Sequence, residues 1–153
     1  MTDRRFGSIT DILAFAIQRE IDAAAGYATI VAKAATPGLR ELAEDLRRQE
    51  EAHRKLLEDL PSEALRDLGT AFTPDLHIVD TLADERLAGD MSVQDMLIFA
   101  AKKEAQAVAL YESLARMAGA SGHERVFLFL AGQEREHKLK LEAEYEKQVL
   151  QEN

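Results

Sequence analysis

The sequence carries two copies of one segment. Residues 11–60 superimpose on residues 95–144 without a gap, at an offset of 84 positions, and the two copies share 16 identities in 50 positions. A composition of this kind would give roughly three or four identities by chance. A repeat of this length indicates one supersecondary unit that occurs twice, so that each copy covers the apolar face of the other.

Each copy predicts a pair of helices. The 153 residues contain only 8 Gly and 3 Pro, and Ala, Leu, Glu and Arg are abundant, which favours long helices over strands. In the first copy we expect helices over about residues 9–34 and 37–60. Thr36 is a good N-cap for the second of these helices, and Pro37 suits its first position.

The second copy shows similar start signals. Ser92 with Asp95 resembles a capping pair for the third helix, and Ser121 with Glu124 forms a capping box for the fourth. The fourth helix should run to near the C-terminus. We therefore predict an all-α four-helix bundle that forms a single domain over residues 1–153.

A long crossover is expected between the two hairpins, residues 8–60 and 92–144. Residues 61–91 contain two Pro and two Gly and should be mostly irregular. About 30 residues extend up to roughly 100 Å, whereas a 25-residue helix is only about 37 Å long. The linker can therefore cross the full length of the bundle, or reach a second chain and swap the halves between two subunits.

A carboxylate stands in the middle of the first apolar stripe. On a helical wheel of about 100° per residue, apolar residues lie within about 60° of Glu20. They are Leu13, Ala16, Ala23, Ala24, Tyr27 and Val31. A lone carboxylate buried there would be costly, so Glu20 must be neutral, paired or bound to a metal ion.

The other helices bring similar residues to the same level. Glu50 and His53 are three positions apart and project from one face of the second helix. Glu20 lies almost as far from the end of its helix, near Ala34, as Glu50 lies from the start of the next helix. The two carboxylates therefore reach the same height in an antiparallel hairpin, because the rise per residue of a helix is constant. The repeat supplies the corresponding residues of the second hairpin: Glu104, Glu134 and His137.

Four carboxylates and two imidazoles at one level predict a two-metal site. One Glu from each of two helices and a Glu-x-x-His pair from each of the others is the pattern of di-iron and di-manganese bundles. Four negative charges balance two divalent cations, and carboxylates can bridge them. The predicted metal ligands are Glu20, Glu50, His53, Glu104, Glu134 and His137. We expect two iron ions, although carboxylate and imidazole also suit Mn and Zn. The alternative is a buried, proton-sharing polar network without metal.

Tyr27 and Tyr111 each follow a predicted ligand by two helical turns and lie on the same helix face. We expect their hydroxyl groups to donate hydrogen bonds to ligand carboxylates, and plain core packing is the alternative. Other repeated or isolated polar residues should face a helix neighbour or solvent. They are Gln49, Gln133, Glu51, Glu58, Glu136, Glu142, His77 and His123.

Composition excludes several classes of protein. A net charge of -9 disfavours nucleic acid as a partner. The absence of Cys excludes disulfides, Cys-ligated zinc, iron–sulfur clusters and a rubredoxin-type iron centre within this sequence. No apolar run predicts a signal peptide or a membrane span, so no membrane partner is expected and we expect a cytoplasmic protein.

The motifs resemble the rubrerythrin branch of the ferritin-like superfamily over roughly residues 8–147. The residues that carry the resemblance are Glu20 with Tyr27, the segment Gln49–His53, Glu104 with Tyr111, and the segment Gln133–His137. The resemblance implies a ferritin-like fold, a di-iron site on the six residues named above and supporting roles for the two tyrosines. It also implies a homodimer.

The resemblance implies peroxide chemistry with an external reductant. Rubrerythrins reduce hydrogen peroxide, while relatives oxidise Fe(II), store iron or use dioxygen. The chain lacks the Cys-ligated rubredoxin domain, so a separate electron donor, such as a rubredoxin-like protein, is expected. The family often has a further Glu one helical turn after the third-helix ligand, where this chain has Ala107. We expect peroxide reduction in oxidative-stress defence, with ferroxidase activity or a non-catalytic iron-binding module as alternatives.

Overall fold

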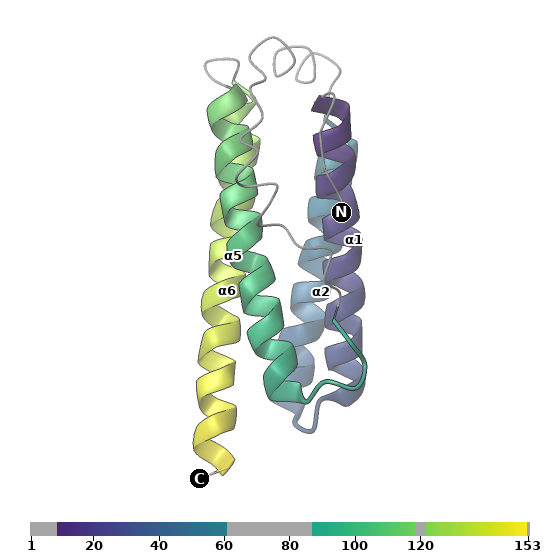
Figure 1. Cartoon of the computed structure of the whole chain (residues 1–153), viewed down its shortest axis with the longest axis vertical. Coiled ribbons are helices and arrows are strands. Elements are labelled where there is room, and N and C mark those ends of the chain that lie inside the picture. The colour runs from purple at the N-terminus through teal and green to yellow at the C-terminus, as the bar shows by residue number, and fades with distance from the viewer. Residues whose placement is uncertain (1–8, 61–86, 119–121, 153) are drawn as a thin grey trace, which may run out of the picture.

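The structure, a computed structural model, describes residues 9–60, 87–118 and 122–152. Within these ranges the chain forms helices and no strand (Figure 1). The helices are α1 (Ile9–Lys33), α2 (Pro37–Glu58), α5 (Val93–Ala118) and α6 (Glu124–Glu152). The predicted all-α four-helix bundle is confirmed. None of the described helices combines the length and the apolar character that crossing a membrane requires.

The helices pack as two antiparallel hairpins. Figure 1 shows α1 beside α2 and α5 beside α6, and most helix contacts lie within these two pairs. Contacts of α1 with α5 and of α2 with α6 join the hairpins. This arrangement matches the two copies seen in the sequence. Most of the predicted crossover, residues 61–86, lies outside the described residues, as does His77.

Two predicted helix starts have the expected caps. The Thr36 hydroxyl accepts a hydrogen bond from the Leu39 N–H at 3.2 Å, which satisfies one of the free N–H groups at the start of α2. The Ser92 hydroxyl does the same for the N–H of Asp95 at 3.1 Å, just before α5. The sequence therefore predicted the beginnings of α2 and α5 from local chemistry alone.

The start of α6 differs from the prediction. The helix begins at Glu124, whereas a capping box on Ser121 requires it to begin directly after that residue. Gly122 has a φ of 91°, a left-handed conformation that glycine adopts without steric cost and that a helix cannot include. Ser121 itself lies outside the described residues.

Two apolar layers fill the bundle, one on each side of its middle. The first layer joins the early part of α1 to the later part of α5, with Ile12, Leu114, Phe127 and Leu130 among its buried residues. The second joins the later part of α1 to the early parts of α2 and α5. Its buried residues include Ile30, Leu39, Leu46, Met96 and Leu97. The predicted ligands fall between these layers along each helix.

Candidate metal centre

The six predicted ligands meet in the middle of the bundle and are buried. Helix α1 supplies Glu20 and α5 supplies Glu104, while α2 and α6 each supply a Glu and a His one helical turn apart. The exposed fractions are 0% for Glu20, Glu50 and Glu134, 1% for Glu104 and His137, and 3% for His53. No other acidic or histidine side chain is buried in the described part of the chain. We refer to these six residues as the carboxylate–histidine centre.

The centre divides into two overlapping groups. Ligand atoms of Glu20, Glu50, His53 and Glu134 lie within 4.8 Å of one another, as do those of Glu50, Glu104, Glu134 and His137. Glu50 and Glu134 belong to both groups. The remaining residues define two positions, one on Glu20 and His53 and the other on Glu104 and His137. This geometry suits two cations that share two bridging carboxylates.

Both imidazoles turn their Nδ1 atoms towards the shared carboxylates. His53 Nδ1 lies 3.0 Å from Glu134 Oε1 and 3.3 Å from Glu50 Oε1. His137 Nδ1 lies 3.0 Å from Glu50 Oε1 and 3.4 Å from Glu134 Oε1. The two rings stack with centroids 5.6 Å apart and planes 10° from parallel. The shared carboxylate oxygens therefore lie between the two rings, where each faces both positions.

Several buried polar atoms of the centre have no hydrogen-bond partner among the described residues. They are Glu20 Oε2, both carboxylate oxygens of Glu50 and of Glu134, Glu104 Oε2, both ring nitrogens of His53, and His137 Nδ1. Buried polar atoms are normally hydrogen-bonded, and leaving one unpaired costs about 1–3 kcal/mol. Carboxylate oxygens and imidazole nitrogens are cation ligands, so the residues present fit a pair of bound metal ions.

The pKa values show how strongly the metal-free centre holds protons. Burial and then the charge of Glu134 raise the pKa of Glu104 to about 8. Burial also raises the pKa of Glu50 well above its ordinary value, with further contributions from Glu104 and Glu134. Burial alone would lower the pKa of His53 and His137, but the surrounding carboxylates raise both to about 12. Metal ions must therefore replace protons when they bind.

The two tyrosines bind the terminal carboxylates, Glu20 and Glu104, each of which belongs to only one of the two groups. The Tyr27 hydroxyl donates to Glu104 Oε1, and the Tyr111 hydroxyl donates to Glu20 Oε1, each at 2.5 Å. Each tyrosine thus serves the carboxylate of the opposite hairpin. Burial raises the pKa of both tyrosines well above 10, and the nearby carboxylates raise it further. Both hydroxyl groups therefore stay protonated and donate.

Gln49 has a role that the sequence did not reveal. Its Oε1 lies 2.8 Å from His137 Nε2, so a proton on Nε2 leaves His137 Nδ1 free to face the carboxylates. The sequence predicted only that Gln49 faces a helix neighbour. The one signal for a closer role was its repetition at Gln133, next to a ligand in each copy.

The sequence did not predict any role for Arg19 at the centre. Its side chain is 11% exposed, and its Nη1 lies 4.0 Å from Glu134 Oε2. Its Nη2 donates to the backbone carbonyl of Lys103 on α5 at 2.9 Å. The sequence carried no signal for this placement, because a basic residue next to Glu20 on a helix is usually solvated. The corresponding residue of the second copy, Lys103, is also basic and gave no further indication.

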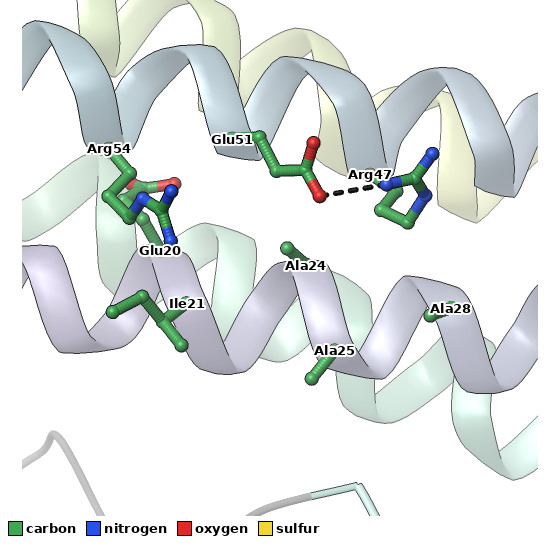
Figure 2. A pocket seen from close by; sticks show the side chains of 8 residues that line it. All are labelled: Glu20, Ile21, Ala24, Ala25, Ala28, Arg47, Glu51 and Arg54. Atoms are coloured by element: carbon green, nitrogen blue, oxygen red, sulfur yellow. Dashed lines mark hydrogen bonds and ion pairs between the residues drawn. The ribbon is translucent and has the colours of Figure 1, made fainter.

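A groove lies beside the centre between α1 and α2 (Figure 2). It has a volume of ≈ 280 Å³. Small residues of α1 form one wall, and charged residues of α2 form the other. The lining residues are Glu20, Ile21, Ala24, Ala25, Ala28, Arg47, Glu51 and Arg54. Figure 2 shows the ion pair between Arg47 and Glu51, whose atoms are 2.7 Å apart.

The remaining polar residues behave mostly as the sequence predicted. Glu51, Glu58, Glu136 and Glu142 are exposed. Glu58 pairs with Arg54 at 3.7 Å and Glu142 with Lys138 at 3.2 Å, both on the outer surface. His123 is half-buried in the turn before α6.

Comparisons with known proteins agree with the geometry. The Rubrerythrin family model matches residues 11–145, a range that contains the whole centre. A solved structure of a hypothetical protein from Pyrococcus furiosus is 26% identical, with a TM-score of 0.73. The similarity covers 92% of this chain and 89% of that one. No curated protein sequence matches the chain significantly.

Proposed function

The chain belongs to the rubrerythrin family, and from this premise we propose that it is a di-iron carboxylate oxidoreductase that reduces hydrogen peroxide. One observation carries the proposal. Glu50 and Glu134 are common to two overlapping groups of ligand atoms, each completed by one further Glu and one His. Two positions that share two carboxylates suit a pair of redox-active cations better than they suit two independent ions.

The charge of the centre supports two ferrous ions. Glu20 and His53 would hold one ion, Glu104 and His137 the other, and Glu50 and Glu134 would bridge them. Four carboxylates carry four negative charges, which two divalent cations neutralise. When bound, the pair of ferrous ions supplies one electron each, and these two electrons with two protons reduce one hydrogen peroxide molecule to two water molecules.

The protein's own residues keep the centre arranged for this reaction. Tyr27 and Tyr111 bind one oxygen of Glu104 and of Glu20, which leaves the second oxygen of each carboxylate for a cation. Gln49 orients the ring of His137. The apolar layers on either side exclude bulk water, which strengthens the electrostatic interactions inside.

Electrons would come from a separate donor. This sequence contains no Cys and therefore no rubredoxin-type iron centre of its own. A one-electron carrier that docks on the surface, such as a rubredoxin-like protein, would return both iron ions to the ferrous state. Two single-electron transfers are needed for each peroxide molecule.

Ala107 favours a second candidate function, the oxidation of ferrous iron by dioxygen. Family members with a further Glu at this position use it in peroxide chemistry, whereas Ala107 is fully buried here within the apolar layer around Leu110 and Leu114. Its repeat mate is Ala23, so the two halves offer the same ligand types. Such a matched pair of positions suits ferroxidase activity as well as peroxide reduction.

Stopped-flow oxidation of anaerobically Fe(II)-loaded protein separates the candidates. Peroxide and dioxygen are mixed with the protein in parallel, and we expect peroxide to react orders of magnitude faster. Equal or faster reaction with dioxygen would favour ferroxidase activity. Slow reaction with both oxidants would favour a non-catalytic iron-binding module. Glu58→Gln on the outer face of α2 is the control, because it alters a carboxylate of the same helix outside the centre.

A further inference from the structure

The two halves of the centre have the same ligands but different surroundings. Arg19 and Lys103 occupy the same position in the two copies of the repeat. Arg19 is 11% exposed and turns inwards. The Lys103 ammonium instead lies 5.5 Å from the centroid of the Phe99 ring. The pseudo-symmetry of the ligands is therefore broken by one buried positive charge.

The charge of Arg19 acts on Glu20 more strongly than on Glu104. Arg19 directly precedes Glu20 on α1, and its Nη1 is 4.0 Å from Glu134 Oε2 without a hydrogen-bond partner in the described chain. Its Nη2 donates to the Lys103 carbonyl, so the guanidinium lies where α1 packs against α5 and α6. An arginine guanidinium is not deprotonated in proteins, so this charge is permanent.

The two imidazoles also have different hydrogen-bond partners, and this difference again favours the position of His137. His137 Nε2 is 2.8 Å from Gln49 Oε1, a contact that orients the ring and makes Nδ1 a stronger ligand. His53 Nε2 is buried and has no hydrogen-bond partner among the described residues. Loss of a partner of this kind typically weakens metal binding by about 10–100-fold.

The outer faces of the hairpins differ as well. The groove between α1 and α2 runs along Ala24 and Ala28 to Glu20. The repeat mates of these two alanines are Val108 and Glu112, which are larger. Glu112 Oε2 also pairs with Arg135 Nη2 of α6 at 3.3 Å. Glu20 therefore lies at a groove wall that is built from small side chains.

We propose that the centre binds divalent cations in two steps, first on Glu104 and His137 and then at least tenfold more weakly on Glu20 and His53, with Arg19 and Gln49 as the residues that set this difference. A second cation at Glu20 must come to rest beside a buried guanidinium. Burial weakens the screening of this repulsion. The inference rests on the proposed function, because it takes the carboxylate–histidine centre to be a two-metal site.

Stepwise binding has a consequence for the reaction. A chain with one iron ion holds one of the two electrons that a peroxide molecule requires. The weaker position therefore makes activity depend on the concentration of available iron. Glu20 also lines the groove between α1 and α2, so we expect the cation at this position to exchange with solution.

Zinc titration of the full-length, metal-free protein tests the proposal without redox chemistry. Calorimetry with a competing chelator gives the two dissociation constants, and NMR signals of the imidazole rings report which position fills. We expect the first equivalent of zinc to shift the His137 signals and the second to shift those of His53. Equal dissociation constants, or filling of the His53 position first, would overturn the proposal. Absence of zinc binding would instead overturn the proposed metal centre itself.

Substitutions test whether Arg19 sets the difference between the two dissociation constants. Arg19→Gln should tighten the second step at least tenfold and leave the first step within about threefold, because the guanidinium acts on Glu20 more strongly than on Glu104. Arg19→Lys keeps the charge and should keep two separate steps. Lys103→Gln is the matched control at the repeat position and should change neither step. Unchanged dissociation constants in a folded Arg19→Gln protein would show that Arg19 does not set the difference. The order of filling in the wild-type protein remains decisive if that variant does not fold.

Discussion

The hydroxyl group of Tyr27 on α1 donates a hydrogen bond to Glu104 Oε1 on α5 at 2.5 Å, and so joins the two hairpins through the middle of the bundle. Tyr111 makes the equivalent bond to Glu20 in the opposite direction. Because each terminal carboxylate is held by the other hairpin, the geometry of both metal positions depends on the docking of the two copies. A single hairpin has neither a complete position nor its tyrosine donor.

Removal of one tyrosine hydroxyl should weaken the fold and leave the metal in place. Tyr27→Phe leaves a buried Glu104 oxygen without its donor, so we expect the free energy of unfolding of the metal-free protein to fall by about 1–3 kcal/mol. Denaturant unfolding measures this change, and metal analysis should still find two ions per chain. Tyr145→Phe, at a half-buried position of α6 outside the centre, is the control. Loss of metal from Tyr27→Phe would contradict this account of the tyrosine.

Shared and terminal carboxylates should differ when they are removed. Glu50 belongs to both groups of ligand atoms, whereas Glu20 belongs to one. Glu50→Ala should therefore abolish binding of at least one ion and weaken the other, while Glu20→Ala should retain one ion of near-normal affinity. Metal content after anaerobic loading and desalting measures both results. Glu58→Ala on the exposed face of α2 should bind two ions, and two ions in Glu50→Ala would rule out the proposed bridge.

The metal-free protein should lose stability as the pH rises from 5 to 8. The pKa of Glu104 is raised to about 8, so its protonated form stabilises the fold fully below its ordinary pKa near 4.5 and progressively less as the pH approaches 8. His53 and His137, with pKa values of about 12, act in the same direction above pH 6.5. Urea unfolding at several pH values in the presence of a chelator measures the trend.

The contribution of bound metal to stability should change with pH in the opposite direction. Binding displaces the protons of the centre, so the stabilisation that zinc contributes should grow from pH 5 to pH 8. A parallel urea series with saturating zinc measures the difference between the two forms. A pH-independent contribution of zinc would mean that neither the carboxylates nor the imidazoles of the metal-free centre carry displaceable protons in this range.

The apolar layer next to the centre should carry much of the stability. Leu46 is fully buried in the layer that joins α1, α2 and α5. Leu46→Ala should lower the free energy of unfolding by about 2–5 kcal/mol, because it removes buried methyl groups and leaves a cavity. Leu139→Ala on α6, which is 59% exposed, should change it by less than about 0.5 kcal/mol. Similar losses in both variants would argue against this division of core and surface.

Much of the fold was determined by the sequence itself. Helical periodicity, the caps at Thr36 and Ser92 and the constant offset between the two copies are local or countable properties, and they predicted the two hairpins. The heights of Glu20 and Glu50 followed from counting residues to a turn, because the rise per residue of a helix is constant. The same counting predicted that six ligand-type side chains would meet at one level, as they do.

Only the tertiary structure decided how the two hairpins face each other. A sequence places a residue on a helix face, but the rotation and separation of packed helices decide which neighbour it reaches. Docking made Tyr27 a donor to Glu104 rather than to Glu20 of its own helix, and it placed Glu50 between both histidines. Docking also buried Arg19 against α5 and α6, because a long side chain extends to whatever surface the neighbouring helix presents. The matched ligands are therefore a property of the repeated sequence, whereas the difference between their surroundings exists only in the assembled bundle.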